Sequence, residues 1–450
     1  MSEFAGKKIV VAGLGVTGAS TARVLLEEGA NVFVTEAKST PDIDKRAALL
    51  RAAGAEVEVG GHSLGSITAD VAVVSPGIPP GSEVIRGLEE SGIPIISEIE
   101  LAYRFAKCDL LAVTGTNGKT TTTSLLAAIL RAAGIDSVAA GNIGLPLIDA
   151  VRRVSDSGVI AVEVSSFQLA YVERFRPRVA VLLNVAEDHT DWHGSITSYA
   201  EAKARILENQ GPDDHAVVNR DDQRVVEIAR AGAGETVTFS LSDPGADAFL
   251  RDGVMYWHDE PIADATDVAL QGAPGWADSL AAAAAALAYG VDLDSVRRAL
   301  TDFTPLHHRM EVVGSVDGVT YIDDSKATNP HATLAAVGGL RDVVLIAGGR
   351  SKGIDLSALA AVAPPVIGVV AIGEAAEELV RIFDGRAPVV ATTTMEEAVA
   401  RASEMSVPGG SVLLSPGCAS LDMYSSYAER GEAFARAARA LGARRTEDGR

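Results

Sequence analysis

The chain has 450 residues, of which 47% are hydrophobic and 22% charged, the balance of an ordinary globular protein. At this length we expect about three domains rather than a single hydrophobic core. The formal net charge of −21 provides no general basic field for nucleic acid or an anionic membrane surface, so any anionic ligand must be held by local donors.

The amino-terminal stretch MSEFAGKKIVVAG lacks the cationic lead and the long apolar run of a secretory signal. Elsewhere no apolar run approaches the roughly 20 residues of a membrane span. The two cysteines, Cys108 and Cys418, are too few for a disulfide framework and favour a reducing compartment. We therefore expect a cytoplasmic enzyme or nucleotide-binding protein, with neither nucleic acid nor a membrane as a partner. A monomer is a separate expectation, because none of these observations determines the oligomeric state.

Short Val/Ile/Ala-rich runs, each followed by a turn and a longer stretch of helical spacing, indicate βα units and parallel sheets. The runs predicted as strands are KIVVAGLG, NVFVTE, DVAVVSPG, LLAVTGTNG, VIAVEVSS, VAVLLNV, VVLIAGG, VVAIGE and SVLLSPG. They form three blocks, with boundaries after Ser97, where a helix-like IELAYRFAK follows, and at Pro305, which breaks the helical pattern. Because parallel sheets bind ligands beyond the carboxyl ends of their strands, the residues just after these runs are functional candidates.

In the first block, GLGVTG at residues 13–18 matches the G-x-G-x-x-G loop of dinucleotide-binding domains. Glu36 ends the next strand, where a ribose-binding acid belongs in such domains. This pair fits a dehydrogenase, but the glycine motif alone is weak, and a second nucleotide loop follows in the chain. SPGIPP, residues 75–80, closes another strand and adds backbone donors for a diphosphate.

The second block opens with LAVTGTNGKTTTT, residues 111–123, which has the parts of a phosphate-binding loop. Backbone N–H groups and a helix N-terminus meet the phosphates of such a loop, a lysine reaches the outer ones, and a hydroxyl binds magnesium. Gly115, Gly118, Lys119 and Thr120 offer these parts, although the usual spacing requires glycine where Val113 stands. With a strand before it and a helix after it, we favour a nucleotide loop over a turn with a surface lysine.

The stretch VIAVEVSSFQ, residues 159–168, predicts a strand buried on both faces, with Glu163 near its carboxyl end. Buried carboxylates are uncommon unless they are paired or bind a metal. The alternative is an edge strand with a solvated glutamate.

NVAEDHTDWHG, residues 184–194, follows the next strand and contains more acceptors than a plain connection requires, although a solvated loop is equally consistent. These acceptors are Asn184, Glu187, Asp188, His189 and Asp191.

In SITSYAEAKARILEN, residues 195–209, Ser198 and Glu201 fit a capping box at the start of a helix. Helical spacing then places Tyr199, Lys203, Ile206 and Leu207 on one face. A lysine in this apolar stripe either packs its stem and extends its amine to water or is chemically reactive or modified.

The last block has three polar loops that suit a small polyanionic ligand, although ordinary surface loops remain the alternative. They are YIDDSKATNPH with Asp324, Ser325, Lys326, Thr328 and Asn329, then GGRSKG with Lys352, and SPGCASLD with Ser420. We expect Cys418 in the last of these to be a small packed residue rather than a nucleophile, because no histidine partner is indicated nearby.

Taken in order, these motifs resemble the Mur ligases, a family of ATP-dependent enzymes that form amide bonds in peptidoglycan precursor synthesis. TGTNGKT is similar to that family's own shortened phosphate loop, and GLGVTG, GNIGLP, EVSSFQL, NVAEDHTD, LHHRME, DSKATN and SPGCASLD resemble its branch that adds D-glutamate to UDP-N-acetylmuramoyl-L-alanine. The resemblance covers nearly the whole chain. It implies an α/β fold of three domains: a Rossmann-like domain (1–97), a central ATPase-like domain with a parallel sheet (98–305), and a C-terminal Rossmann-like domain (306–450).

The resemblance also implies roles for individual residues. The UDP group would be held by Gly15, Val16, Thr17, Gly18, Thr35, Glu36, Ser75, Pro76 and Gly77. ATP would meet Gly115, Thr116, Asn117, Gly118, Lys119, Thr120, Thr121, Arg309 and Asp324. Two magnesium ions would be held by Thr120, Glu163, His189 and a carbamylated Lys203. The acyl path would be lined by Asn142, Ser165 and Gln168, and D-glutamate would be received by Lys326, Thr328, Lys352, Ser420 and Leu421. The residues expected to carry the chemistry are Lys119, His189, Lys203 and Lys326.

Three alternatives stand beside this expectation: a dehydrogenase, a nucleotide-driven switch without ligase chemistry, and a related ligase that adds glutamate to folate. The motifs GLGVTG and DSKATN argue against the ligase that adds glutamate to folate. The chain also departs from the family, whose His-Asn-x-x-Asn pattern is missing here. We assign no adenine or phosphate contact to the residues in its place, which are Pro274, Gly275, Trp276, Ala277 and Asp278.

Overall fold

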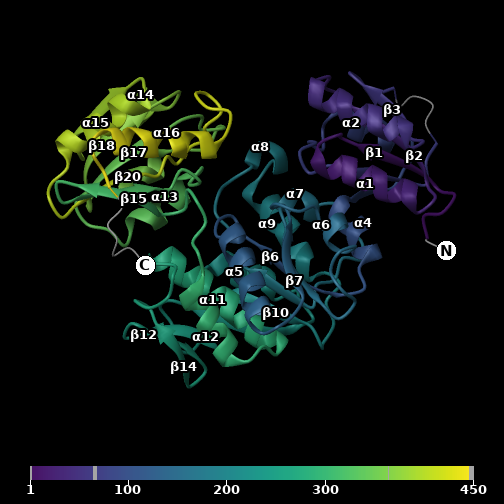
Figure 1. Cartoon of the computed structure of the whole chain (residues 1–450), viewed down its shortest axis with the longest axis horizontal. Helices are drawn as coiled ribbons and strands as arrows, with labels where there is room; N and C mark the ends of the chain where they lie inside the picture. Colours follow the sequence, from purple (N-terminus) through teal and green to yellow (C-terminus); the bar gives the residue numbers. More distant parts are fainter. Residues whose placement is uncertain (1–2, 64–67, 363, 445–450) are drawn as a thin grey trace. The chain divides into compact units, whose positions relative to one another are not determined.

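A computed structural model describes residues 3–63, 68–362 and 364–444 of the chain. The described strands form three sheets, of five, nine and six strands in chain order (Figure 1). The chain divides into two compact units: the first comprises residues up to Val185, Trp192–Ala263 and Leu280–Ala299, and the second comprises Ala186–Asp191, Asp264–Ser279 and the chain from Leu300 onward. In the described ranges no helix has the length and apolar character needed to cross a membrane. Residues 445–450 of the predicted third domain lie outside them.

The first sheet is parallel, and helices pack on both of its faces. Its elements are β1 (Lys8–Ala12), α1 (Val16–Glu27), β2 (Asn31–Glu36), α2 (Pro41–Ala52), β3 (Glu56–Val59), β4 (Val71–Val74), α3 (Glu83–Glu90) and β5 (Ile95–Ser97). The strand order is β3-β2-β1-β4-β5, so the chain reverses direction across the sheet between β1 and β4. Ile9 and Val11 pack with α1 and α2, whereas Val10 and Ala12 pack with α3. This alternation is expected of a strand buried on both sides.

The second sheet carries the phosphate loop, and α4 (Glu98–Phe105) leads into it. Its first elements are β6 (Asp109–Thr114), α5 (Lys119–Ala132), β7 (Ser137–Gly141), α6 (Leu147–Ala150), β8 (Val159–Glu163), α7 (Ser166–Leu169), β9 (Val179–Leu182), α8 (Thr190–His193), α9 (Ile196–Ala204), the helical turn η1 (Arg205–Leu207), β10 (His215–Asn219) and α10 (Gln223–Ala229). The parallel strands β7, β8, β6, β9 and β10 lie side by side in that order. Helix α5 packs on β6, β7 and β8.

The second sheet continues into an extension that the sequence reasoning did not predict. Its elements are β11 (Glu235–Ser240), β12 (Ala248–Arg251), β13 (Val254–Trp257) and β14 (Glu260–Asp264), followed by α11 (Gly272–Tyr289) and α12 (Leu293–Asp302). Strands β12 and β13 form an antiparallel hairpin whose turn residues, Asp252 and Gly253, have φ values of 51° and 81°. An Asp-Gly pair between two short strands is a strong hairpin signal, and it was present in the sequence.

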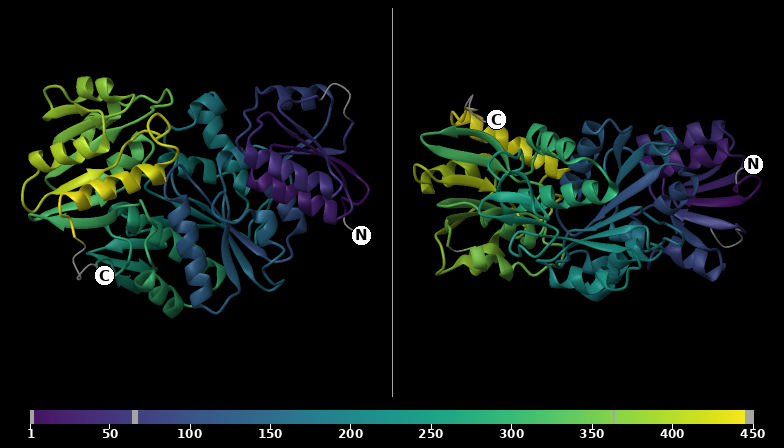
Figure 2. Two further views of the ribbon diagram at one scale, coloured as in Figure 1. Left: turned by 45° about the horizontal axis from the view of Figure 1, so that its top comes forward. Right: turned by 90° about the horizontal axis from the view of Figure 1, so that it is seen from below.

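The third sheet has the order β15-β16-β20-β17-β18-β19, with only β15 antiparallel to its neighbour. Its elements are β15 (Glu311–Val316), β16 (Val319–Asp323), α13 (Pro330–Val337), β17 (Val343–Gly348), the helical turn η2 (Ser357–Val362), β18 (Val366–Ile372), α14 (Ala376–Phe383), β19 (Val389–Thr392), α15 (Met395–Met405), β20 (Ser411–Leu414) and α16 (Tyr427–Ala440). Val344 and Ile346 pack with α15 and α16, the latter being the yellow helix of Figure 2. Val343 and Leu345 pack with α13, η2 and α14 on the other face.

All nine runs predicted as strands are strands, but the predicted start of helix α9 is wrong. The residue that caps this helix is Ser195, whose side chain accepts a hydrogen bond from the backbone N–H of Ser198. Ser198 therefore lies in the first turn and forms no capping box with Glu201. The stretch Ser-Ile-Thr-Ser offers the capping geometry twice, and the helix takes the earlier serine.

Candidate functional site

The phosphate loop joins β6 to α5, and two of its glycines are required by its geometry. Gly118 has φ of 85° and directly precedes Lys119, the first residue of α5. A Cβ atom added at Gly115 would lie 2.9 Å from the Cβ of Leu183. Within the described residues no side chain caps the N-terminus of α5, so its first backbone N–H groups are suitable donors for a phosphate. Thr120 is half-buried in the first turn, whereas Thr121 is buried.

Asn184, which follows β9, braces this loop. Its Oδ1 accepts hydrogen bonds from the backbone N–H groups of Thr116 and Asn117, at 3.1 and 2.8 Å. Its Nδ2 donates to the carbonyl of Asn117 at 3.1 Å. The loop is therefore held open by one side chain that satisfies three backbone groups. In the sequence Asn184 was only one of several acceptors after a strand.

Two lysines donate to the same carbonyl of the loop. Lys119 Nζ lies 2.9 Å from the oxygen of Gly115 and 2.8 Å from that of Thr116, and Lys203 Nζ lies 2.8 Å from the oxygen of Gly115. The ammonium of Lys203 also lies 4.4 Å from the ring centroid of Tyr199. Tyr199 in turn donates from its hydroxyl to Thr116 Oγ1 at 3.2 Å.

Lys203 is 1% exposed, and Tyr199, Ile206 and Leu207 are also buried, so the predicted apolar face is confirmed. The alternative in which the Lys203 amine extends to water is wrong, because the amine ends on a backbone carbonyl. A lysine so deeply buried beside a second lysine calls for a chemical reason rather than a packing one.

Glu163 ends β8, which lies between β6 and β7, so the edge-strand alternative is wrong. The side chain is 2% exposed, and its Oε1 accepts a hydrogen bond from Asn142 Nδ2 at 2.9 Å. Its Oε2 is buried and has no hydrogen-bond partner within the described residues. Such an oxygen suits a cation, because leaving a buried carboxylate oxygen unpaired is unfavourable.

Ser165 and Gln168 form a reciprocal capping box at the start of α7. Gln168 Nε2 also donates to Glu98 Oε1 at 2.6 Å. Burial raises the pKa of Glu98 to about 7, against the hydrogen bond from Gln168, and Glu98 Oε2 has no partner in the described structure. Glu98 could not be identified from the sequence, because acids are common in the first turn of a helix.

The predicted residues of the first sheet come together where the strand order reverses. A Cβ atom added at Gly13 would lie 2.6 Å from Ser75 Oγ, which brings the loop of residues 13–18 against that of 75–77. Helix α1 begins at Val16, which is 61% exposed, and Gly15 precedes it without a side-chain cap.

Both carboxylate oxygens of Glu36 accept a hydrogen bond from the backbone. Oε2 accepts from the backbone N–H of Leu14 at 2.8 Å, and Oε1 accepts from that of Lys38 at 2.9 Å. Thr35 is fully buried, and its hydroxyl lies 2.7 Å from His62 Nδ1. Glu36 therefore braces the glycine loop at Leu14, whereas the Thr35 hydroxyl contacts Gly61 and His62.

In the second unit, the loops after β16, β17 and β20 hold the residues predicted for the amino acid. These strands are neighbours in the sheet, so the loops carrying Lys326 and Thr328, Lys352, and Ser420 and Leu421 meet at one edge. Lys326 Nζ lies 3.9 Å from the ring centroid of Tyr427. Ser420 is buried, whereas Leu421 is 60% exposed.

Sequence reasoning missed the arginine that ties these loops together. Arg430, in α16, is 2% exposed and donates to the carbonyls of Ser325, Cys418 and Gly348, at 2.8, 3.1 and 3.4 Å. Burial lowers its pKa to about 10. Cys418 is packed in the core as predicted, and burial raises the pKa of its thiol to about 12.

Asp324 is also buried in this unit, where Ser415 donates to its Oδ2 at 2.9 Å. Burial raises its pKa to about 7, against the Ser415 hydrogen bond and the positive charge of Arg309.

Asp188 Oδ2 accepts a hydrogen bond from Asn329 Nδ2 at 3.2 Å, and His189 beside Asp188 has φ of 53°. His189 thus belongs to the second unit, whereas Lys203 belongs to the first.

The residues that replace the family's asparagine pattern lie in the first turns of α11. Trp276 Nε1 donates to the carbonyl of Ala265 at 3.0 Å, and a Cβ atom added at Gly275 would lie 2.8 Å from the backbone of Leu270. This segment therefore packs on the chain that precedes it.

Comparison with known proteins places this geometry in a family. Three family models match successive parts: the Mur ligase MurD-like N-terminal domain at residues 7–97, the Mur ligase middle domain at 113–285, and the Mur ligase glutamate ligase domain at 308–418. The UDP-N-acetylmuramoylalanine–D-glutamate ligase of Shouchella clausii is 42% identical over 440 residues, which cover 96% of this chain and 97% of that one. The enzyme of the same name from Frankia casuarinae is 42% identical over 451 residues, covering 97% and 95%.

A solved structure, the UDP-N-acetylmuramate–alanine ligase of Thermotoga maritima, shares the fold, with a TM-score of 0.61 at 19% identity over 97% of this chain and 100% of that one. The sequence matches exclude the dehydrogenase, the nucleotide-driven switch and the folate-linked ligase. The chain belongs to the Mur ligase family, in the group of UDP-N-acetylmuramoylalanine–D-glutamate ligases, which are ATP-dependent enzymes that form an amide bond in peptidoglycan synthesis.

Proposed function

We propose that the chain joins the alanyl carboxylate of UDP-N-acetylmuramoyl-L-alanine to the amine of D-glutamate, and that ATP first converts this carboxylate to an acyl phosphate. The observation that carries the proposal is the convergence of Lys119 and Lys203 on the carbonyl of Gly115, in a loop that ends at a helix N-terminus. We also propose domain boundaries after Ser97 and Pro305, a cytoplasmic location and a monomeric state.

The proposed chemistry follows from the poor reactivity of a carboxylate, whose charge is delocalised and whose leaving group would be oxide. The carboxylate oxygen attacks the γ-phosphorus of ATP, the bond to the β-phosphate oxygen breaks, and ADP leaves. The D-glutamate amine then attacks the acyl carbon. The tetrahedral intermediate expels inorganic phosphate and loses a proton from nitrogen, leaving the amide.

Electrostatics make the first step demanding, because a carboxylate must approach a triphosphate. Each pair of like unit charges at contact opposes this by about 4 kcal/mol at an effective dielectric constant of about 20. Lys119 would exchange the carbonyls of Gly115 and Thr116 for phosphate oxygens, and the N–H groups of Gly118 to Thr121 would donate to the phosphates. Arg309 and Asp324, which belong to the second unit, would also bind ATP.

Two magnesium ions fit the residues proposed to hold them. Thr120 and Glu163 would bind one ion, in keeping with the buried, unpartnered Oε2 of Glu163 in the described structure. His189 and a carbamylated Lys203 would bind the other, since carbamylation turns a cation into an anionic oxygen ligand and accounts for a buried lysine beside Lys119. When bound, the ions would neutralise phosphate charge during transfer.

The other predicted residues would hold the two substrates of the amide bond. The UDP group would lie at the N-terminus of α1 and the loop of residues 75–77, where backbone N–H groups suit a diphosphate. Asn142, Ser165 and Gln168 would line the path of the acyl group. Lys326 and Lys352 would meet the carboxylates of D-glutamate, with Thr328, Ser420 and Leu421 around it.

One experiment tests the whole proposal. The protein is mixed with ATP, magnesium and UDP-N-acetylmuramoyl-L-alanine, L- and D-amino acids are offered, and phosphate release and product mass are followed. We expect phosphate release and a new amide only with D-glutamate. Oxygen-18 placed in the alanyl carboxylate should appear in the inorganic phosphate, and its absence there would rule out the acyl phosphate.

A further inference from the structure

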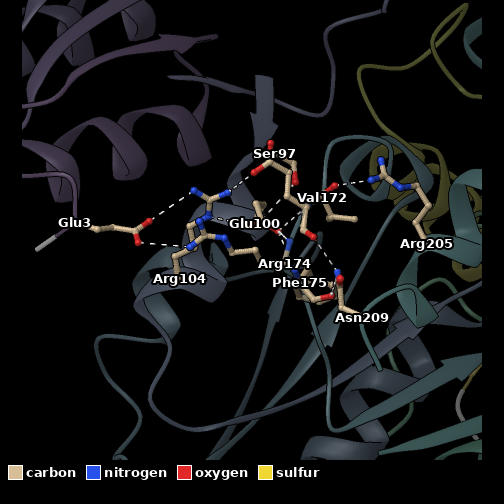
Figure 3. A network of polar contacts seen from close by, with 10 residues as sticks. Glu3, Ser97, Glu100, Arg104, Val172, Arg174, Phe175, Arg205 and Asn209 are labelled. Atoms are coloured by element: carbon tan, nitrogen blue, oxygen red, sulfur yellow. Dashed lines mark hydrogen bonds and ion pairs between the residues drawn. The ribbon is translucent and has the colours of Figure 1, made fainter. Parts of the chain in front are cut away.

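The end of helix α9 is anchored to an irregular connector, residues 170–178, that links α7 to β9. Arg205 lies two residues after Lys203, and its guanidinium donates to the carbonyls of Ala170 and Val172, both at 2.5 Å. Asn209 Nδ2 donates to the carbonyls of Glu173 and Phe175, at 3.1 and 3.2 Å. Figure 3 shows Arg205 beside Val172 and Asn209 beside Phe175 on the right of the network. One edge of the connector is therefore bound to the segment that follows Lys203.

The amide groups of the same connector are held from α4. Glu100, whose side chain is fully buried, accepts from the backbone N–H groups of Glu173, Arg174 and Phe175 through one oxygen, at 2.9 to 3.0 Å (Figure 3). Its other oxygen accepts from Arg104 Nε at 2.8 Å. Hydrogen bonds to charged groups are about twice as strong as neutral ones. The connector is thus a fixed support, clamped by a carboxylate at its amides and by a guanidinium at its carbonyls.

We propose that Arg205 is a positioning residue for Lys203. Its two hydrogen bonds to the connector fix the axial and rotational position of α9, so that the Lys203 amine stays on the carbonyl of Gly115. This inference rests on the proposed role of Lys203 in the reaction. If α9 shifted by one residue, the Lys203 side chain would move by about 1.5 Å along the helix axis and about 100° around it. This displacement would remove the amine from the loop.

The chemistry of arginine explains why this position is sensitive. A planar guanidinium can direct two parallel N–H groups at two separate carbonyls, whereas a lysine amine is a point charge with a single centre. The third donor of Arg205, Nε, pairs with Glu208 at 2.8 Å, and Glu208 is 49% exposed. Glu208 therefore provides a matched control, because its removal leaves both carbonyl contacts intact.

The test compares the full chain with R205K, R205A, E208A and K203A. Protein equilibrated with carbon-13 bicarbonate, without nucleotide or substrate, is examined by NMR for a carbamate carbon. The kcat, the KM for the UDP-linked substrate, the magnesium dependence and the thermal unfolding temperature are measured in parallel. Losing a residue that orients a metal ligand lowers activity or metal affinity by about 10- to 100-fold, and we expect this range for kcat in R205K and R205A.

The carbamate signal should fall to less than half in both Arg205 variants, and half-maximal activity should need more magnesium, while the KM for the UDP-linked substrate stays unchanged. E208A should match the wild type. If R205A does not fold, R205K decides. If wild-type protein shows no carbamate signal, kcat and the magnesium dependence decide.

Arg205 variants that unfold earlier but keep the wild-type carbamate signal, kcat and magnesium dependence would reduce Arg205 to a structural residue and overturn the inference. Failure of the proposed function has a different signature: K203A would then be as active as the wild type.

Discussion

The side-chain amines of Lys119 and Lys203 share one acceptor, the carbonyl oxygen of Gly115, at 2.9 and 2.8 Å. One lysine begins α5 and the other lies near the end of α9, so side chains from the two helices converge on a single backbone atom. As unmodified ammonium groups the two would repel each other, and the proposed carbamylation of Lys203, which makes the end of its side chain anionic, would remove that repulsion. Lys119 would then be the cation that meets the phosphates, and the two side chains that share the oxygen are 84 positions apart in the sequence.

Replacing Lys203 with alanine should abolish most of the activity while the protein still folds. The rate of phosphate release should fall by about 10- to 100-fold or more, because a proposed metal ligand is lost. Folding survives because Tyr199, Ile206 and Leu207 keep the apolar face of the helix. Steady-state kinetics measures the loss of activity, and thermal unfolding measures whether the fold is kept. A near-normal rate would remove Lys203 from the mechanism.

Replacing Glu163 with glutamine separates charge from shape. The glutamine oxygen can still accept from Asn142 Nδ2, so the fold should be unchanged. The unpartnered oxygen becomes an amide that cannot bind a cation. We expect kcat to fall by about 10- to 100-fold and the magnesium requirement to rise. A magnesium titration of activity at saturating ATP measures this, and an unaltered titration curve would exclude Glu163 as a ligand.

Replacing Asn184 with alanine should loosen the phosphate loop. The backbone N–H groups of Thr116 and Asn117 lose their side-chain acceptor, a change worth about 1–3 kcal/mol for buried groups. The KM for ATP should rise more than the KM for the UDP-linked substrate. N184D is a second variant: it keeps the acceptor, but it loses the donor to the Asn117 carbonyl and adds a negative charge, so it should also raise the KM for ATP. Equal effects on both KM values would contradict a role confined to the ATP loop.

Glu98 should make the protein less stable as the pH rises from 4.5 towards 7. Its pKa is raised from 4.5 to about 7 by burial, so in this window the folded state holds a proton that the unfolded state has released. Folding stability then falls by up to about 1.4 kcal/mol per pH unit, and the loss is complete above the folded pKa. Urea unfolding of wild type and E98Q at several pH values tests this, and parallel pH profiles for the two proteins would refute it.

The sequence predicted the parts of the fold and site that depend on neighbours along the chain. Parallel strands buried on both faces are continuous apolar runs, which is why the nine predicted runs are strands. Glu163 and Lys203 stood out because a charge in an apolar pattern is unusual.

Contacts between residues that are distant in the sequence could not be predicted from local patterns. Glu98 meets Gln168 across 70 positions, and Arg430 meets Ser325 across 105, so neither contact leaves a local pattern. The strands β11 to β14 are short and half-exposed, and their pattern is weaker than the hairpin signal that joins two of them.

Glu36 stands where many nucleotide-binding folds keep a free acid to recognise the sugar hydroxyls. Here that acid has become part of the scaffold, because both of its oxygens end on backbone amides of Leu14 and Lys38. Each oxygen keeps a second lone pair, so under the proposed function a sugar would meet a carboxylate that the backbone has already oriented. Reversing the charge at Glu36 should therefore deform the glycine loop as well as weaken binding of the UDP-linked substrate.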